Sequence, residues 1–197
     1  MRKKHLLWIF IGMLGLMACQ NEEVYTPKPR GYCRMDIQDT GFVCLENKYP
    51  YSFEYSQYAY IDPYPYRNTD STKYWINIVY PNLNAVMYIS YKQFNNKDLL
   101  NSMISDARTL VFKQTQKADD IIESTITDEE SHVFGKLYQA VGQEVPCPYQ
   151  LWLSDREQHF FRLSLYFNCT PNNDSLAPAI DYLAKDIFHL IETFDWK

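Results

Sequence analysis

The residues best suited to nucleophilic or metal chemistry are five cysteines and four histidines. No two histidines stand at metal-ligand spacing and no C-x-x-C pair is present, so zinc, the sharper alternative to disulfides for these thiols, is not expected. The motifs G-x-S-x-G, S-x-x-K and H-E-x-x-H are absent, and the six glycines form no phosphate-binding loop. The sequence therefore predicts no catalytic residue and no metal ion, and we interpret His132, His159 and His189 as structural.

Two acidic clusters carry the oxygen ligands that calcium prefers. They are Asp119 with Asp120, and Asp128 with Glu129 and Glu130. Neither cluster has the alternating ligand spacing of a calcium-binding loop, so the sequence favours solvated acidic turns.

Cys19 has a specific chemistry because of the segment that precedes it. A basic head, Arg2–Lys4, is followed by the apolar run Leu6–Leu16. This run is much shorter than the about 20 residues of a membrane-spanning helix, and its basic head and small-residue end are typical of a secretory signal. With Leu16–Ala18 before it, Cys19 resembles the lipobox cysteine of bacterial lipoproteins, which becomes the first residue and carries diacylglycerol. We predict a signal peptide over residues 1–18, the alternative being a soluble secreted protein with an incidental cysteine.

The residues after Cys19 indicate which membrane holds the lipid anchor. Gln20 stands where an aspartate would retain many lipoproteins in the inner membrane, so we expect the outer membrane. Glu22 and Glu23 are similar to a surface-export signal or are simply a solvated linker, which leaves the membrane face open. Residues 19–30 are predicted to form a lipidated tether and residues 31–197 a single domain.

Charge and cysteine content narrow the partners and the environment. Without residues 1–18 the chain has 179 residues, with 16 basic against 24 acidic, so its net charge is −8, which argues against nucleic acid. An even number of remaining cysteines in an exported protein permits two disulfides. We predict the sequence-local pairs Cys33–Cys44 and Cys147–Cys169, the second flanking a hairpin that turns near residues 155–158.

The hydrophobic pattern predicts an α+β fold. Apolar alternation and β-branched or aromatic residues indicate strands over residues 49–61, 73–80, 84–92, 120–127, 132–141, 150–155 and 159–168. Helical spacing indicates one helix over residues 97–117 and a second that is capped by Asn173 or Asp174, with Pro178 in its first turn. We therefore expect a mainly antiparallel sheet covered by two helices, in an order similar to the α/β/α sandwich of PsbP proteins.

Tyrosine is unusually abundant in one part of the chain. Eleven of the seventeen tyrosines lie between Tyr49 and Tyr91. Exposed tyrosines bind sugars or protein partners, whereas tyrosines in strands are often simply core residues. Pro63 and Pro65 predict a loop in which Tyr64 and Tyr66 are the candidate binding residues.

Several segments together resemble one family. They are "PKPRGYCR", "YPYSFEY", "WINIVYP", "YISYK", "KQTQKAD", "GKLYQAVG", "HFFRLSLYFNCTPNNDSLAPA" and "ETFDWK". In these segments the chain resembles the gliding motility-associated GldD lipoproteins of the Bacteroidetes. The cysteines of "GYCR" and "GFVC" depart from that pattern, so the resemblance does not imply a Cys33–Cys44 disulfide.

The resemblance implies a non-enzymatic accessory lipoprotein that supports gliding and type IX secretion through contacts with other lipoproteins. Apart from the acyl anchor on Cys19 no cofactor is expected, and the sequence does not identify a small-molecule ligand. The most distinctive segments supply candidate partner-binding residues, which are Pro27, Lys28, Pro29, Arg30, Asn168, Pro171 and Asp174. Two alternatives stay open: a carbohydrate or peptidoglycan binder that uses the tyrosine-rich loop, and a hydrolase with an unrecognised site.

Overall fold

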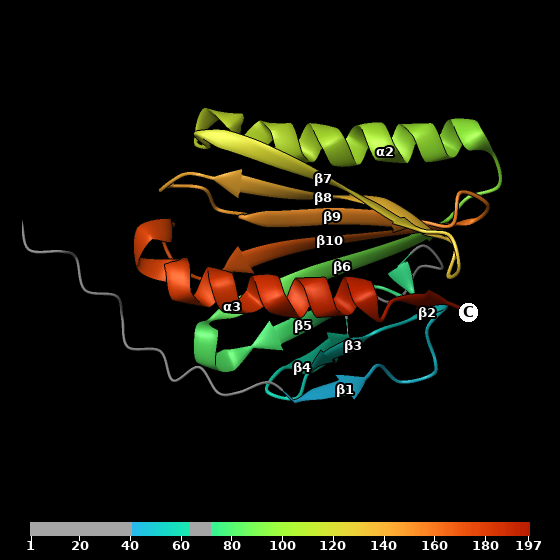
Figure 1. Cartoon of the computed structure of the whole chain (residues 1–197), viewed down its shortest axis with the longest axis horizontal. Helices are drawn as coiled ribbons and strands as arrows, with labels where there is room; N and C mark the ends of the chain where they lie inside the picture. Colours follow the sequence, from blue (N-terminus) through green and yellow to red (C-terminus); the bar gives the residue numbers. More distant parts are fainter. Residues whose placement is uncertain (1–40, 64–71) are drawn as a thin grey trace, which may run out of the picture. The chain divides into compact units, whose positions relative to one another are not determined.

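The computed structural model describes residues 41–63 and 72–197. All of them belong to the second of the two units into which the chain divides, residues 31–197. The described residues form a seven-stranded antiparallel sheet with one long helix on each face (Figure 1). The predicted α+β architecture is confirmed.

The sheet consists of two meanders that meet at its centre. The first contains β4 (Tyr60–Pro63), β5 (Ile76–Tyr80) and β6 (Ala85–Gln93), and the second contains β7 (Asp120–Asp128), β8 (Val133–Val141), β9 (Tyr149–Ser154) and β10 (His159–Phe167). Helix α2 (Lys97–Phe112) connects β6 to the far edge of the sheet, and the second meander returns from there to pair β10 with β6. The strand order is therefore β4-β5-β6-β10-β9-β8-β7.

Local sequence signals explain where these elements begin and end. A 3-10 turn over Pro81–Leu83 joins β5 to β6, and Asn84 closes it in the left-handed conformation with a φ of 49°, which asparagine adopts more readily than most residues. Asn96 precedes α2, and its side-chain oxygen accepts the N–H of Leu99 at 2.7 Å. This contact is a helix N-cap, which satisfies one of the free N–H groups of the first turn.

Helix α3 (Asn173–Glu192) covers one face of the sheet and buries the larger core. Leu183, Ile187 and Leu190 of this helix are almost fully buried in that core. On the opposite face, α2 buries a smaller cluster, in which Leu100, Met103 and Ala107 pack with Phe94 and Phe160. The two clusters define an α/β/α arrangement whose middle layer is the sheet.

A cluster of aromatic side chains inside the larger core connects the sheet to the short strands β2 (Tyr51–Ser52) and β11 (Asp195–Trp196). The ring of Phe161 on β10 lies 5.1 Å from that of Tyr51 and 5.0 Å from that of Phe194. Tyr51 belongs to β2, which pairs with the C-terminal β11. The Tyr51 hydroxyl donates to the carbonyl of Tyr74 at 2.6 Å, so its polar group is satisfied despite full burial.

The predicted single strand over residues 49–61 is wrong. This segment forms three short strands with different partners: β2 pairs with β11, β3 (Glu54–Ser56) pairs with β1 (Phe42–Cys44), and β4 pairs with β5. Alternation in the sequence indicates strands but does not identify their partners, which come from distant parts of the chain. β4 also continues through Pro63, which is tolerated because β4 is an edge strand.

The helix boundaries differ slightly from the prediction. The first helix ends at Phe112 and is followed by a 3-10 turn over Lys113–Gln116, so helical turns fill nearly all of the predicted range. The second helix has Asn172 as its N-cap residue, without a side-chain cap, and Pro178 falls in its second turn. Proline there lacks the N–H that would otherwise bond the carbonyl of Asp174.

Asp186 is a buried carboxyl group on the core side of α3. Only 2% of the residue is exposed, and neither carboxylate oxygen has a hydrogen-bond partner. Burial raises the pKa of Asp186 from 3.8 to about 6, against a smaller opposing influence of Tyr80 and His189. The charged form is therefore unfavourable in the folded state.

We predict that Phe161→Ala lowers the free energy of unfolding by about 3–5 kcal/mol, because it leaves a cavity among rings that cannot collapse to fill it. Urea unfolding of the domain followed by circular dichroism measures this change. Tyr60→Ala is the matched control, since Tyr60 is 53% exposed and surface changes usually stay within about 0.5 kcal/mol. Equal losses for the two variants would show that Phe161 does not hold this core together.

We predict that Asp186→Asn raises stability at pH 7.5 and leaves it nearly unchanged at pH 4. A carboxyl whose pKa is raised on folding costs no stability below its unfolded pKa; the cost grows as the pH rises from 3.8 to its folded pKa of about 6, and it is constant above that pH. Each pKa unit corresponds to about 1.4 kcal/mol, so we expect a gain of about 2–3 kcal/mol. Unfolding curves at several pH values measure it, and a difference that does not change with pH would refute the assignment.

Candidate functional site

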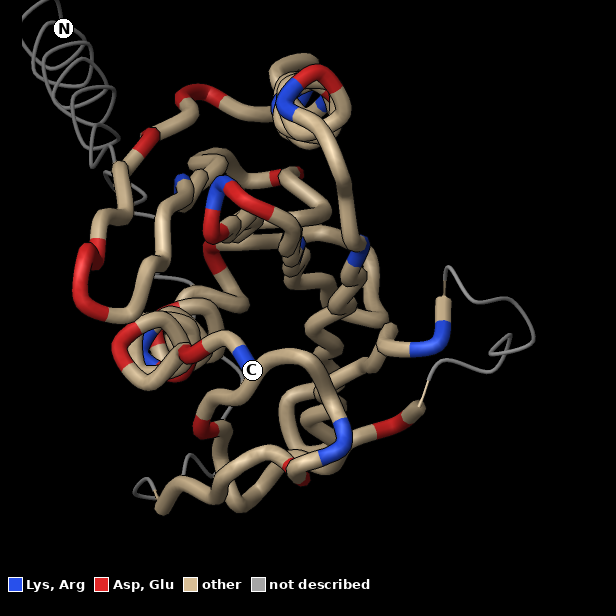
Figure 2. The backbone as a smooth tube through the Cα atoms, turned by 90° about the vertical axis from the view of Figure 1, so that its right-hand side faces the viewer, with Lys and Arg blue, Asp and Glu red and all other residues tan. Residues whose placement is uncertain are grey.

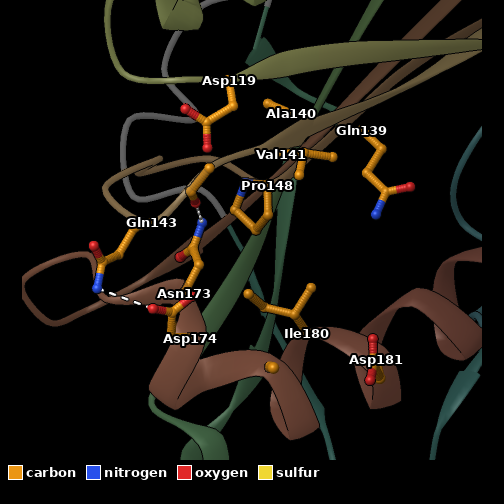
Figure 3. A pocket seen from close by; sticks show the side chains of 12 residues that line it. Asp119, Gln139, Ala140, Val141, Gln143, Pro148, Asn173, Asp174, Ile180 and Asp181 are labelled. Carbon is orange, nitrogen blue, oxygen red and sulfur yellow. Dashed lines mark hydrogen bonds between the residues drawn. The ribbon is translucent and has the colours of Figure 1, made fainter.

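The candidate site is a hollow of about 400 Å³ at the beginning of α3 (Figure 3). Its walls come from Asp119 just before β7, the end of β8, the β8–β9 connection and the first turns of α3. Figure 3 shows polar side chains from all of these elements around one opening. The hollow therefore exists only in the folded domain, because its walls are far apart in the sequence.

Asn173 fastens the helix to the β8–β9 connection. Its side-chain amide donates to the carbonyl oxygens of Gly142 at 2.8 Å and of Val145 at 3.1 Å. Its backbone N–H donates to the carbonyl of Gln143 at 2.8 Å. Gly142 has a φ of +151°, and a Cβ there would lie 2.8 Å from the carbonyl oxygen of Lys117. Glycine at this position therefore lets the connection approach the chain that precedes β7.

The lining of the hollow is acidic at its rim and apolar at its floor. Asp119, Asp174 and Asp181 contribute carboxylates, and the Gln143 amide donates to Asp174 Oδ2 at 3.0 Å. The apolar surface comes from residues such as Ala140, Pro148 and Ile180, and none of the described lining residues is basic. Carboxylates above an apolar floor suit an alkyl chain that ends in a cation, as in a lysine or arginine side chain.

The predicted partner-binding residues that the structure describes do not lie together in one site. Asp174 lines the hollow. Asn168 is exposed and Pro171 is half-buried in the connection from β10 to α3. The N–H of Asn168 donates to the carbonyl of Asn84 at 2.8 Å, and the Asn84 side chain donates back to the carbonyl of Asn168 at 2.9 Å. Asn168 therefore joins two turns at one end of the sheet.

Several predicted site residues lie outside the described part of the chain. They are Cys19, Pro27, Lys28, Pro29, Arg30, Cys33, Tyr64 and Tyr66. The Cys33–Cys44 pair is therefore untested.

The predicted Cys147–Cys169 disulfide is absent, because both residues are free thiols in the structure. Cys147 is buried and donates to the carbonyl of Tyr149 at 3.5 Å, whereas Cys169 is exposed. Continuing the β9–β10 register places Cys147 opposite Phe167, two residues before Cys169. The two cysteines do flank the predicted hairpin, but they are not opposite each other.

Most of the described tyrosines in the tyrosine-rich region serve the core. Tyr49, Tyr51, Tyr80 and Tyr91 are each at most 5% exposed, and Tyr55 and Tyr74 are half-buried and pack against the same core. Among the described tyrosines of this region, Tyr58, Tyr60 and Tyr88 are exposed.

His159 belongs to a buried cluster of polar side chains that resembles a catalytic relay. Its Nδ1 shares a short hydrogen bond with the Tyr91 hydroxyl, its Nε2 lies 4.0 Å from Asp155, and its ring stacks on Trp196. Burial lowers the pKa of His159 and raises that of Tyr91 to about 12. Asp155 also accepts three backbone N–H groups, those of residues 157–159. At neutral pH Tyr91 is therefore protonated and a poor nucleophile, and the group fastens the β9–β10 turn.

Sequence reasoning missed most residues of the hollow. In the sequence Asp119 belongs only to an acidic turn and Asn173 only to a predicted helix cap, and Gln143 and Asp181 belong to no recognised motif. Among the described residues, no group of three His, Cys, Asp or Glu side chains could hold a metal ion. No described helix is long and apolar enough to span a membrane.

Comparison with solved structures identifies one similar fold. The solution structure of cyanobacterial PsbP (CyanoP) from Synechocystis sp. PCC 6803 has a TM-score of 0.50 and 9% sequence identity. The similarity covers 85% of this chain and 98% of that chain. At such low identity it shows the fold alone, and it confirms the predicted PsbP-like arrangement.

Comparison of sequences gives the family. A search of the curated proteins finds no match. The family described as gliding motility lipoprotein GldD matches residues 22–196, which is most of the chain. This is not a known enzyme family, and its lipoprotein character indicates a membrane-anchored protein of the cell envelope. The chain belongs to the gliding motility lipoprotein GldD family.

Proposed function

We propose that this protein is an accessory lipoprotein of the gliding and type IX secretion machinery, which acts by binding partner proteins and catalyses no reaction. The observation that carries the proposal is the family match over residues 22–196, nearly all of the chain that follows Cys19. Other lipoproteins of that machinery are the proposed partners.

The hollow at the start of α3 supports a binding role. Its described lining contains no serine, cysteine or histidine, so it offers no Ser–His or Cys–His pair of the kind that activates a hydroxyl or thiol nucleophile. Its three aspartates instead offer acceptors for a cationic side chain of a partner protein, and Asn173 holds the walls in place from within. Charged pairs of this kind contribute to specificity and to the rate of association.

The anchor proposed on Cys19 would keep this surface at the membrane. Each buried CH₂ group of an acyl chain contributes about 0.8 kcal/mol, and stable anchoring requires two or more chains. We place the protein in the outer membrane because Gln20 follows the cysteine. The polar segment over residues 20–30 would then separate the domain from the lipid.

We predict that Cys19→Ala abolishes incorporation of labelled palmitate and moves the protein out of the membrane fraction. The cause is loss of the thiol that would carry the lipid, which leaves no acyl chain to insert. Cys33→Ala is the control and should stay labelled and membrane-bound. Palmitate labelling of Cys19→Ala equal to that of the unchanged protein would refute the anchor.

We predict that a photo-crosslinking amino acid at Gln143 captures lipoproteins of the gliding or type IX secretion machinery in living cells. Gln143 is exposed at the rim of the hollow. The crosslink should be lost in a second chain that also carries Asp181→Lys, because a new cation repels the expected lysine or arginine. Asp106→Lys, an equal charge reversal at an exposed position of α2, should leave the crosslink unchanged.

Two results would contradict the proposed function. One is a crosslinked product that contains only cell-wall material, which would favour the carbohydrate-binding alternative; that binding should then require Tyr64 and Tyr66. The other is equal crosslinking in the Asp181→Lys and Asp106→Lys chains, because partner contact would not then depend on the acidic hollow.

A further inference from the structure

β7 is the edge strand of the sheet and is unusually open to pairing. All nine of its residues pair with β8 in one continuous register, without a bulge or a proline. No strand of the described chain pairs with its other edge. At about 3.3 Å per residue the free edge is about 30 Å long. Such an edge presents a row of N–H and C=O groups that can pair with another strand.

Helix α2 lies near β7 but leaves most of the strand exposed. The closest ionic contact is between Arg108 and Glu123, at 3.6 Å. Seven of the nine β7 residues are exposed, including Ile122 at 47%. Figure 1 shows β7 at the top of the sheet, with α2 beside it and no strand beyond it. The edge is therefore accessible to an added strand.

The charged residues along this edge are all acidic. Six acidic residues and no basic residue occur between Asp119 and Glu130. Figure 2 shows this segment as a stretch of the backbone with acidic positions only. Lys136 of β8 contacts Glu123 at 2.7 Å and so neutralises one of the six. The remaining acids make the edge attractive to cations.

The same charges disfavour pairing between two copies of this chain. Antiparallel pairing centred on Ser124 would set Asp120 of each copy opposite Asp128 of the other. Like charges directly opposite each other destabilise a strand pair. A strand that carries lysine or arginine would instead gain both ladder hydrogen bonds and ion pairs.

We propose that the free edge of β7 binds an extended, basic segment of a partner protein, which adds an eighth strand to the sheet. The segment would carry lysine or arginine at alternate positions, because alternate side chains of a strand point to the same face. Asp119 precedes β7 and also lines the hollow at α3, so the acidic edge continues into that hollow. This inference does not depend on the proposed role in gliding or secretion.

The test uses a fluorescent peptide of about ten residues that alternates lysine with threonine or valine. Fluorescence anisotropy measures its binding to the chain without residues 1–18. The matched peptide has the same sequence and charge but N-methyl groups on its four central amides. Methylation removes ladder hydrogen bonds without removing charge, so we expect its affinity to fall at least about tenfold. Hydrogen–deuterium exchange should show new protection within residues 120–128.

Charge variants of the protein test the acidic part of the proposal. Asp120→Asn with Asp128→Asn should weaken the unmethylated peptide several-fold. Asp62→Asn with Glu46→Gln removes the same total charge from exposed residues, one on β4 at the opposite edge of the sheet and one between β1 and β2, and should leave binding unchanged. Asparagine keeps a side-chain acceptor for the N–H groups that Asp120 and Asp128 bond, so folding should persist.

Three results would overturn the proposal. Equal affinity of the two peptides would mean that charge alone attracts them. Protection confined to residues outside 120–128 would place the peptide elsewhere. No binding at about 1 mM peptide would mean that the edge does not accept a basic strand at all.

Discussion

The pairing of β6 with β10 is the contact on which the rest of the described domain depends. All nine residues of β10 pair with β6, and this ladder joins two meanders that have no other shared strand pair. In the aromatic core, the ring of Phe161 on β10 packs against the rings of Tyr51 and Phe194. Because α3 directly follows β10, the same ladder also sets where the helix begins and where the acidic hollow forms.

Sequence periodicity predicted the elements better than it predicted their contacts. The alternation of Phe161, Leu163 and Leu165 identified β10 and its buried face, and the helical stripes identified both long helices. The partners of the segment over residues 49–61 could not be predicted, because each short strand there pairs with a different distant segment. The predicted Cys147–Cys169 disulfide is wrong for a related reason, because two residues that flank a hairpin need not lie opposite each other.

The candidate site was harder still to predict. Its walls come from residues 119, 139–148 and 173–181, and no single stretch contains a motif. Tyr91, His159 and Asp155 most resemble a catalytic arrangement. Their contacts are explained by burial and by the turn that they stabilise. The described surface is instead distinguished by acidic charge, in the hollow and along β7. Surface charge of this kind suits the proposed binding of partner proteins.

Partner binding through the acidic hollow is tested by complementing a host that lacks this protein with the variant Asp119→Asn, Asp174→Asn and Asp181→Asn. These changes remove the charge of the hollow and keep its shape nearly unchanged. The measured quantity is secretion of a type IX substrate, with the amount and membrane fraction of the variant monitored in parallel. If the carboxylates of the hollow bind the partner, secretion is lost while the variant stays abundant and membrane-bound. Full secretion by the variant would contradict this binding.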